Sequence, residues 1–294
     1  MMMHKNSPAS LIGAAARKFA ANRLAAISLL FLLAVLALCL LAPWLTAYDP
    51  AKIDLRGLNK GPSAEHWLGT DKGGRDIVSR LLFGGRTTLW ISLCVSAIIA
   101  GTGTVVGVLA GYFGGSADSL LMRITDVILS FPFLIFIIVV KSIYQGGGIP
   151  SLIWTVGLLG WGGFARIIRA KTLAEKENEY IMAASALGAG TLRILTRHLL
   201  PGLLSVFITN LMWTAAAMIG VEASLSFLGF GVPVGQPSWG NMLADAQSPA
   251  VIREQWWVWL PAGLLITGVI LSINFISEGV KEAFRVSRET FMIF

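Results

Sequence analysis

Long runs of apolar residues dominate the chain, and shorter polar segments separate them. The runs fall at residues 24–45, 89–112, 127–144, 150–168, 203–225 and 258–277. Each approaches the roughly 20 apolar residues that a helix needs to cross a bilayer. The pattern therefore predicts an all-α membrane protein with six transmembrane helices, and it leaves no sizeable soluble domain over.

Composition supports the same class of protein. The chain is 55% hydrophobic and only 13% charged, whereas soluble domains carry about 25% charged residues. A soluble globular protein is therefore excluded. Cys39 and Cys94 both fall inside predicted spans, so we interpret them as packed small residues and not as part of a disulfide or a metal site.

The distribution of lysine and arginine predicts the orientation in the membrane. Most of these 23 residues lie in the N-terminal tail, in 166–198 and near the C-terminus. Positive loops face the cytoplasm, so we expect a multi-pass protein of a bacterial or archaeal cytoplasmic (inner) membrane with both termini inside. The net charge of +7 then follows from topology, and it does not require a nucleic-acid partner.

The predicted spans divide the chain into four parts. We expect a cytoplasmic tail at 1–23, a first transmembrane helix with an external loop at 24–87, a five-helix core at 88–284, and a second cytoplasmic tail at 285–294. The N-terminal tail does not resemble a cleavable signal. Its residues 10–23 could form a basic helix on the membrane surface or a frayed tail that only sets topology.

Two predicted spans contain residues that shape helix packing. Gly103, Gly107 and Gly111 recur at four-residue spacing, which predicts a flat face that lets a second helix approach closely. Pro132 lies inside the third predicted span and predicts a kink or an early break there. Asp126 lies near the start of that span, with Arg123 as its expected local partner.

The polar segment 172–201 has the pattern of two short helices joined at glycine. Thr172-Leu-Ala-Glu175 has the form of a capping box that could start a helix, and Gly188 could end it in the left-handed conformation. Thr191 could cap a second helix, and Pro201 suits the start of the next span. From the residues alone, the segment is either a lever that another protein grips or an ordinary cytoplasmic connection.

This segment resembles the EAA loop of ABC importer permeases, which couples a membrane subunit to its ATPase. The EAA pattern is Glu-Ala-Ala, three residues, Gly, nine residues, an aliphatic residue, one residue and Leu-Pro. The residues matching in register are Ala183, Ala184, Gly188, Leu200 and Pro201. Met182 replaces the glutamate and His198 replaces the aliphatic residue.

These departures are similar to those of the C-type permeases of dipeptide, oligopeptide and nickel importers. That subfamily also accounts for Glu179, Tyr180 and Arg197-His198-Leu-Leu-Pro201, although Gly202 stands where asparagine is usual. His66-Trp-Leu-Gly69-Thr-Asp71 with Arg75-Asp76, and Glu222-Ala-Ser-Leu-Ser-Phe227, resemble further stretches of the subfamily.

The resemblance implies a type I ABC importer permease with a cytoplasmic coupling helix. The ATPase-coupling residues would be Glu179, Tyr180, Ala183, Ala184, Gly188, Arg197, His198 and Pro201, and the external loop motif would be Gly69, Asp71, Arg75 and Asp76. The implied partners are a second homologous permease in a heterodimer, two ATPase subunits and an extracytoplasmic substrate-binding protein. Peptides are the expected cargo, with nickel chelates, opines and other small solutes as alternatives.

The chain offers little chemistry of its own. It lacks a phosphate-binding G-x-x-x-x-G-K-[ST] loop, so ATP and Mg are expected on partner chains, and we predict no catalytic residue, no metal site and no cofactor bound by this chain. Glu222 is a candidate for the translocation path or for a packing hydrogen bond. Arg75 and Asp76 could bind a delivering protein or pair within their loop. A stand-alone secondary transporter is the alternative from another class.

Overall fold

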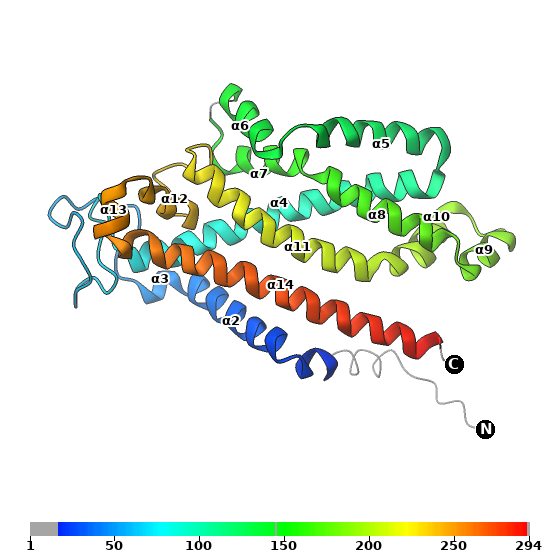
Figure 1. Cartoon of the computed structure of the whole chain (residues 1–294), viewed down its shortest axis with the longest axis horizontal. Helices are drawn as coiled ribbons and strands as arrows, with labels where there is room; N and C mark the ends of the chain where they lie inside the picture. The colour runs from blue at the N-terminus through cyan, green and yellow to red at the C-terminus, as the bar shows by residue number, and fades with distance from the viewer. Residues whose placement is uncertain (1–16, 145, 293–294) are drawn as a thin grey trace.

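The computed structural model describes residues 17–144 and 146–292, and they form one elongated bundle of helices (Figure 1). The first helices are α2 (Arg23–Leu40), α3 (Ala42–Leu45), α4 (Ile77–Phe113), α5 (Gly115–Ser130) and α6 (Phe133–Ile143). They are followed by α7 (Gly148–Leu159), α8 (Trp161–Lys176), α9 (Glu179–Ala186), α10 (Thr191–Ile194) and the π-helical turn η1 (Leu195–Leu199). The last are α11 (Leu200–Phe227), α12 (Trp239–Ala244), the 3₁₀ turn η2 (Asp245–Gln247), α13 (Pro249–Glu254) and α14 (Trp256–Met292).

Five helical stretches are long and apolar enough to cross a membrane, and the pair α5 and α6 makes a sixth if it is counted as one broken span. The two helices of that pair meet at 83°. Pro132 is the residue that precedes α6, so the predicted break at this proline is confirmed. The third predicted span, at 127–144, is therefore not one straight helix, because α5 ends and α6 begins within it.

The predicted external loop at 46–87 is too long, because α4 already begins at Ile77. Asp76 caps this helix by accepting a hydrogen bond from the Ser79 amide at 2.8 Å. Arg80 and Arg86 made these first turns look too polar to belong to the span. The helical residues 17–21 are the described part of the predicted surface helix at 10–23, and the rest of it lies outside the described residues. At the other terminus, α14 continues through 285–292, where a tail was predicted.

Two apolar cores hold the bundle together. One lies among α4, α6, α7, α8 and α11, and the other lies among α2, α4, α11, α12 and α14. The glycine face of α4 packs on α8: a Cβ at Gly107 would lie 2.9 Å from the Cβ of Ile168, and one at Gly111 would lie 2.7 Å from the Cβ of Thr172. The predicted close approach is confirmed, and it lies within this chain.

The bundle has two distinct ends (Figure 1). The described chain starts and finishes at one end, where α9 and α10 also project. The segment 46–76 gathers at the opposite end with α12 and α13. The described parts of the segments predicted to be cytoplasmic therefore lie together, and the described parts of those predicted to be external lie at the other end.

Candidate functional site

The segment α9–α10 forms a helical hairpin at the end of the bundle, and the turn between its helices closes on Gly188. The Gly188 backbone has a φ of 78°, and the Ala189 amide donates to the Ala184 carbonyl at 3.0 Å. This hydrogen bond and the left-handed glycine form a Schellman-type helix end. The predicted role of Gly188 in ending the first helix is confirmed.

Each helix of the hairpin has one buried anchor and an exposed tip. Ile181 of α9 and Ile194 of α10 are buried in the first apolar core. At the tip, Leu187 and Leu192 are 88% and 74% exposed, and Met182 is exposed beside them. Exposed apolar side chains that lie together are candidates for an interaction surface. We call Met182, Ala183, Leu187, Gly188 and Leu192 the hairpin tip.

The other predicted coupling residues surround this tip. Glu179 lies exposed in the first turn of α9, Ala184 is half-buried and Arg197 is exposed on η1. The rings of Tyr180 and His198 lie 6.4 Å apart between their centroids. The structure therefore gathers the predicted residues into one region.

Two predicted helix starts are wrong. Thr172 lies inside α8, which runs without interruption to Lys176, so the capping box at 172–175 does not start a helix. The next helix begins after Asn178. Gly190 takes the N-cap position expected of Thr191. Thr172 is instead needed as a packing residue, because it fills the space over Gly111.

Pro201 lies in the first turn of α11, as predicted, although α10, η1 and α11 continue one another as a single helical stretch from Thr191 to Phe227. Proline lacks an amide proton and clashes with the carbonyl four residues earlier. The π-helical turn η1 lies directly before it and widens the backbone there, as π-bulges do at irregular points within helices. The hairpin thereby passes directly into the long helix α11.

Glu175 is a central residue of this region that sequence reasoning misplaced. It is buried, and it accepts a hydrogen bond from the Tyr180 hydroxyl at 2.7 Å. It also forms an ion pair with Lys171 at 2.7 Å. Its side chain also lies against Gly202, where a Cβ would come within 2.6 Å of Oε1. Glu175 therefore connects α8, α9 and the start of α11. The glycine at 202 is the signal that could have located it.

We expect Gly202→Ala to loosen this connection. The added methyl group would force Glu175 aside, and overpacking of this kind costs about 1–3 kcal/mol. Gly220→Ala is the matched control on the same helix, because a Cβ at Gly220 meets nothing within 4 Å. Thermal unfolding of the two variants in detergent measures the difference. Equal melting temperatures would contradict the assigned contact.

At the opposite end, Asp71 is the centre of an ion-pair cluster. Its carboxylate is fully buried and binds Arg75 at 2.8 Å and also the Arg80 guanidinium. It also accepts hydrogen bonds from the Gly73 and Arg75 amides at 2.7 and 2.9 Å. One carboxylate thereby organises the loop and joins it to α4.

The remaining residues of the external motif also make contacts within the loop. Asp76 binds His66 Nδ1 at 3.0 Å in addition to capping α4. Gly69 has a φ of 73°, and a Cβ there would clash with the Lys60 carbonyl oxygen of the same loop. Both Arg75 and Asp76 thus pair inside the loop, which favours the loop-structural interpretation of these two residues.

Glu222 joins three elements through a buried hydrogen-bond cluster. It is 2% exposed, and it accepts hydrogen bonds from Thr88 at 2.9 Å and from Ser226 at 2.7 Å. The Trp239 amide in turn donates to the Thr88 hydroxyl at 3.1 Å. Glu222 lines neither of the two cavities described below. Its contacts are those of a packing residue, and a place in the translocation path stays a prediction.

We expect Glu222→Gln to lower the stability of the bundle. The side-chain amide nitrogen of glutamine cannot accept a hydrogen bond, so one of the Thr88 and Ser226 hydroxyls loses its acceptor, at a cost of about 1–3 kcal/mol. A lower melting temperature of the purified subunit is the expected result. If both the melting temperature and transport stay unchanged, neither of the two roles holds.

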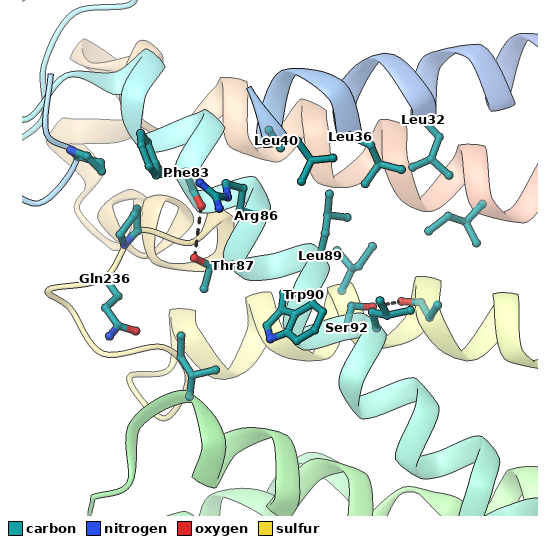
Figure 2. A pocket seen from close by; sticks show the side chains of 18 residues that line it. Leu32, Leu36, Leu40, Phe83, Arg86, Thr87, Leu89, Trp90, Ser92 and Gln236 are labelled. Carbon is teal, nitrogen blue, oxygen red and sulfur yellow. Dashed lines mark hydrogen bonds between the residues drawn. The ribbon is translucent and has the colours of Figure 1, made fainter. Parts of the chain in front are cut away.

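An apolar cleft of about 830 Å³ opens between α2, α4, α11 and α14 (Figure 2). Leu32, Leu36 and Leu40 point into it from α2, and Leu89 and Trp90 line it from α4. Arg86 is the one charged residue among its lining side chains. The cleft therefore fits a lipid chain or an apolar helix better than a polar solute.

This fold defines a polytopic helical membrane protein with an exposed helical hairpin at one end. Two family models match the chain. The one described as "Binding-protein-dependent transport system inner membrane component" matches residues 103–286, and the one described as "N-terminal TM domain of oligopeptide transport permease C" matches residues 10–62. The chain belongs to the family of binding-protein-dependent transport system inner membrane components.

Named relatives are similar over nearly the whole chain. A "Putative peptide permease protein" of Brucella suis is 39% identical over 96% of this chain and 94% of its own length. The oligopeptide transport system permease protein OppC of Lactococcus lactis is 35% identical over 95% of each chain. The dipeptide transport system permease protein DppC of Bacillus subtilis is 34% identical over 91% of this chain and 83% of its own. A chain of the MetNI methionine ABC transporter has a TM-score of 0.49 at 19% identity, covering 68% of this chain and 93% of that one.

Proposed function

We propose that this chain is the permease subunit of an ATP-driven, binding-protein-dependent peptide importer. It would form half of the translocation path with a second, homologous permease. Two ATPase subunits would bind ATP and Mg and dock at the hairpin tip, and a substrate-binding protein would deliver cargo at the opposite end. Family membership supports the general function, and the names of three relatives support peptides as the cargo.

The hairpin tip is the observation that carries this proposal. Its exposed Leu187 and Leu192 offer a partner an apolar contact, while Ile181 and Ile194 fix both helices to the bundle core. A force applied at the tip would therefore reach α8 and α11 without being absorbed by a loose loop. Such an element suits a motor protein that must move a membrane bundle.

Coupling requires that ATP favour one state of the bundle over another. Closure of the ATPase pair on ATP would move the hairpin and open the bundle outward, and hydrolysis would reset it. Glu175 would transmit this movement, because it binds Tyr180 of α9 and lies against Gly202 of α11. This chain itself would remain non-catalytic.

The distribution of charge supports a cytoplasmic location for the hairpin and for both chain ends. Arg166, Arg169, Lys176, Arg193 and Arg197 lie on the segments that lead to the hairpin. Positively charged segments stay on the cytoplasmic side during insertion. The cluster around Asp71 would then face the outside, where the binding protein docks.

Affinity purification of the tagged chain from its native membrane in mild detergent tests the proposal, with mass spectrometry of whatever co-purifies. A second permease, ATPase subunits and an extracytoplasmic binding protein are the expected partners. The purified complex in proteoliposomes should take up peptide only with ATP and binding protein. A chain that purifies alone and moves solute without ATP would instead be a secondary transporter.

A further inference from the structure

A second cavity, of about 800 Å³, lies at the external end of the bundle. The end of α6, the start of α7, the segment 226–234, α12, η2 and the external loop all contribute to its lining. Unlike the apolar cleft, this cavity contains several charged side chains. The site residues predicted from the sequence include only Arg75 among those that line it.

Cations outnumber carboxylates in this cavity. The charged side chains that line it are Lys72, Arg75, Arg80, Lys141 and Asp245.

The carboxylates within reach are already engaged. Asp245 forms an ion pair with Lys72 at 2.9 Å. Asp71, which does not line the cavity, forms ion pairs with both Arg75 and Arg80. Arg80 is 3% exposed, and its Nε has no hydrogen-bond partner among the described residues. The pocket therefore retains positive charge after these pairs are counted.

Lys141 is the positively charged residue of this cavity that has no carboxylate partner among the described residues. It lies in the last turn of α6 and is half-buried. Its Nζ donates to the Ser151 hydroxyl at 3.1 Å, and no carboxylate of the described residues lies within ion-pair distance of it. Near the end of a membrane helix a lysine can extend to the interface, but Lys141 lines a cavity instead, and ionisable residues of membrane segments that face a cavity mark substrate paths. A hydroxyl group satisfies one of its donors but leaves its charge without a counter-ion.

We propose that this cavity binds the C-terminal carboxylate of a peptide as it enters the translocation path, with Lys141 as its charge partner. This inference rests on the proposed function and deepens it. A carboxylate would supply the missing negative charge, and ammonium–carboxylate hydrogen bonds are about twice as strong as neutral ones. Phe227, Leu228 and Val234 line the same cavity and could contact an apolar peptide side chain.

Uptake by the complete transporter tests the inference in proteoliposomes of zwitterionic lipid. The probes are trialanine and its C-terminal amide, each corrected for its measured binding to the substrate-binding protein. Lys141→Met should lower the uptake of trialanine by roughly ten-fold or more and leave that of the amide unchanged. Lys141→Arg should retain uptake. Lys52→Met, in the exposed external loop, is the matched control.

The outcomes separate this inference from the proposed function. A wild-type complex that carries neither peptide with ATP would refute peptide import itself. Import of both peptides by the wild type, with equal effects of Lys141→Met on the two, would overturn the carboxylate site alone. An effect of Lys141→Met that occurs only in vesicles with anionic phospholipid would assign the cavity to a lipid headgroup and would also overturn it.

A thiol probe tests the cavity without any transport. Ser142 lines the cavity and is exposed, so Ser142→Cys can be labelled in a Cys39→Ala, Cys94→Ala background. An anionic methanethiosulfonate should react faster than a cationic one, relative to their rates with a free thiol. Lys141→Met should weaken the preference, and trialanine, but not its amide, should protect the thiol. A preference for the cationic reagent would contradict the inference.

Discussion

Gly188→Leu should abolish the coupling between ATP hydrolysis and uptake while the spans remain inserted. The Gly188 φ of 78° is unfavourable for leucine by roughly 1–2 kcal/mol, so the turn of the hairpin would change. The leucine side chain would also project from the hairpin tip, because a Cβ at Gly188 meets nothing within 4 Å. Both effects act on the hairpin tip and leave the bundle core unchanged.

The measurements are ATPase activity and peptide uptake by the same proteoliposomes, together with ATPase retention on the purified permease. We expect uptake to fall by roughly ten-fold or more, which corresponds to a loss of about 1.4 kcal/mol in the coupled state. Normal uptake by Gly188→Leu would count heavily against a lever at this position.

Two control variants separate strain from bulk at the hairpin tip. Asparagine tolerates the left-handed conformation, so Gly188→Asn should keep the turn and most of the uptake. Gly190 has a φ of −64° and open space around its Cβ, so Gly190→Leu adds bulk without strain. A defect in Gly190→Leu but not in Gly188→Asn would assign the effect to contact with the partner.

The sequence predicted the membrane class because long apolar runs report directly on the bilayer. Five of the six predicted spans correspond to helical stretches that are long enough to cross a membrane. The remaining predicted span, at 127–144, falls on the bent pair α5–α6. Helix ends were less predictable. The start of α4 depends on Asp76 and on the neutralisation of Arg80 by Asp71, a contact that hydropathy does not contain.

Pairing between distant residues is where sequence reasoning failed most clearly. Asp126 was expected to pair with Arg123, but it binds Arg166 of α8. Arg169 of the same helix binds Asp118. Local spacing favours neighbours on one helix, whereas the close packing of α4 on α8 brings the arginines of α8 toward α5. Only the fold supplies that information.

The two short helices and the turn at Gly188 were predicted correctly, but the internal contacts of the segment were not, and its coupling role stays a prediction. The resemblance of 179–201 to the EAA loop indicated where the hairpin lies. The turn at Gly188 followed from the ability of glycine to adopt the left-handed conformation. Glu175 was interpreted as part of a helix cap because its spacing from Thr172 fits one. Its buried contact with Gly202, 27 positions later, could not be inferred from that spacing. Lys141 could not be singled out from the sequence, because the cavity around it forms from several separate segments.

Asp71→Ala should produce the largest loss of stability among the external residues. The substitution leaves the buried Arg75 and Arg80 without their shared carboxylate, and removing one partner of a buried ion pair costs about 3–5 kcal/mol. It also removes the acceptor of the Gly73 and Arg75 amides. The loop should therefore detach from the start of α4.

Asp49→Ala is the matched control for this loss, because Asp49 is exposed and its carboxylate accepts one hydrogen bond among the described residues, from the Ala51 amide at 2.8 Å. Thermal unfolding in detergent should show a large decrease for Asp71→Ala and almost none for Asp49→Ala. Trypsin added from the outside should also cleave the loop at Arg56 or Lys60 faster in Asp71→Ala. Equal melting and equal cleavage would mean that the two arginines find other counter-ions, and the Asp71 cluster would then not hold the loop to the bundle. Asp71→Asn keeps the shape of the side chain without its charge, so the loss in that variant would measure the ion pairs, and the further loss in Asp71→Ala would measure the hydrogen bonds and packing of the side chain.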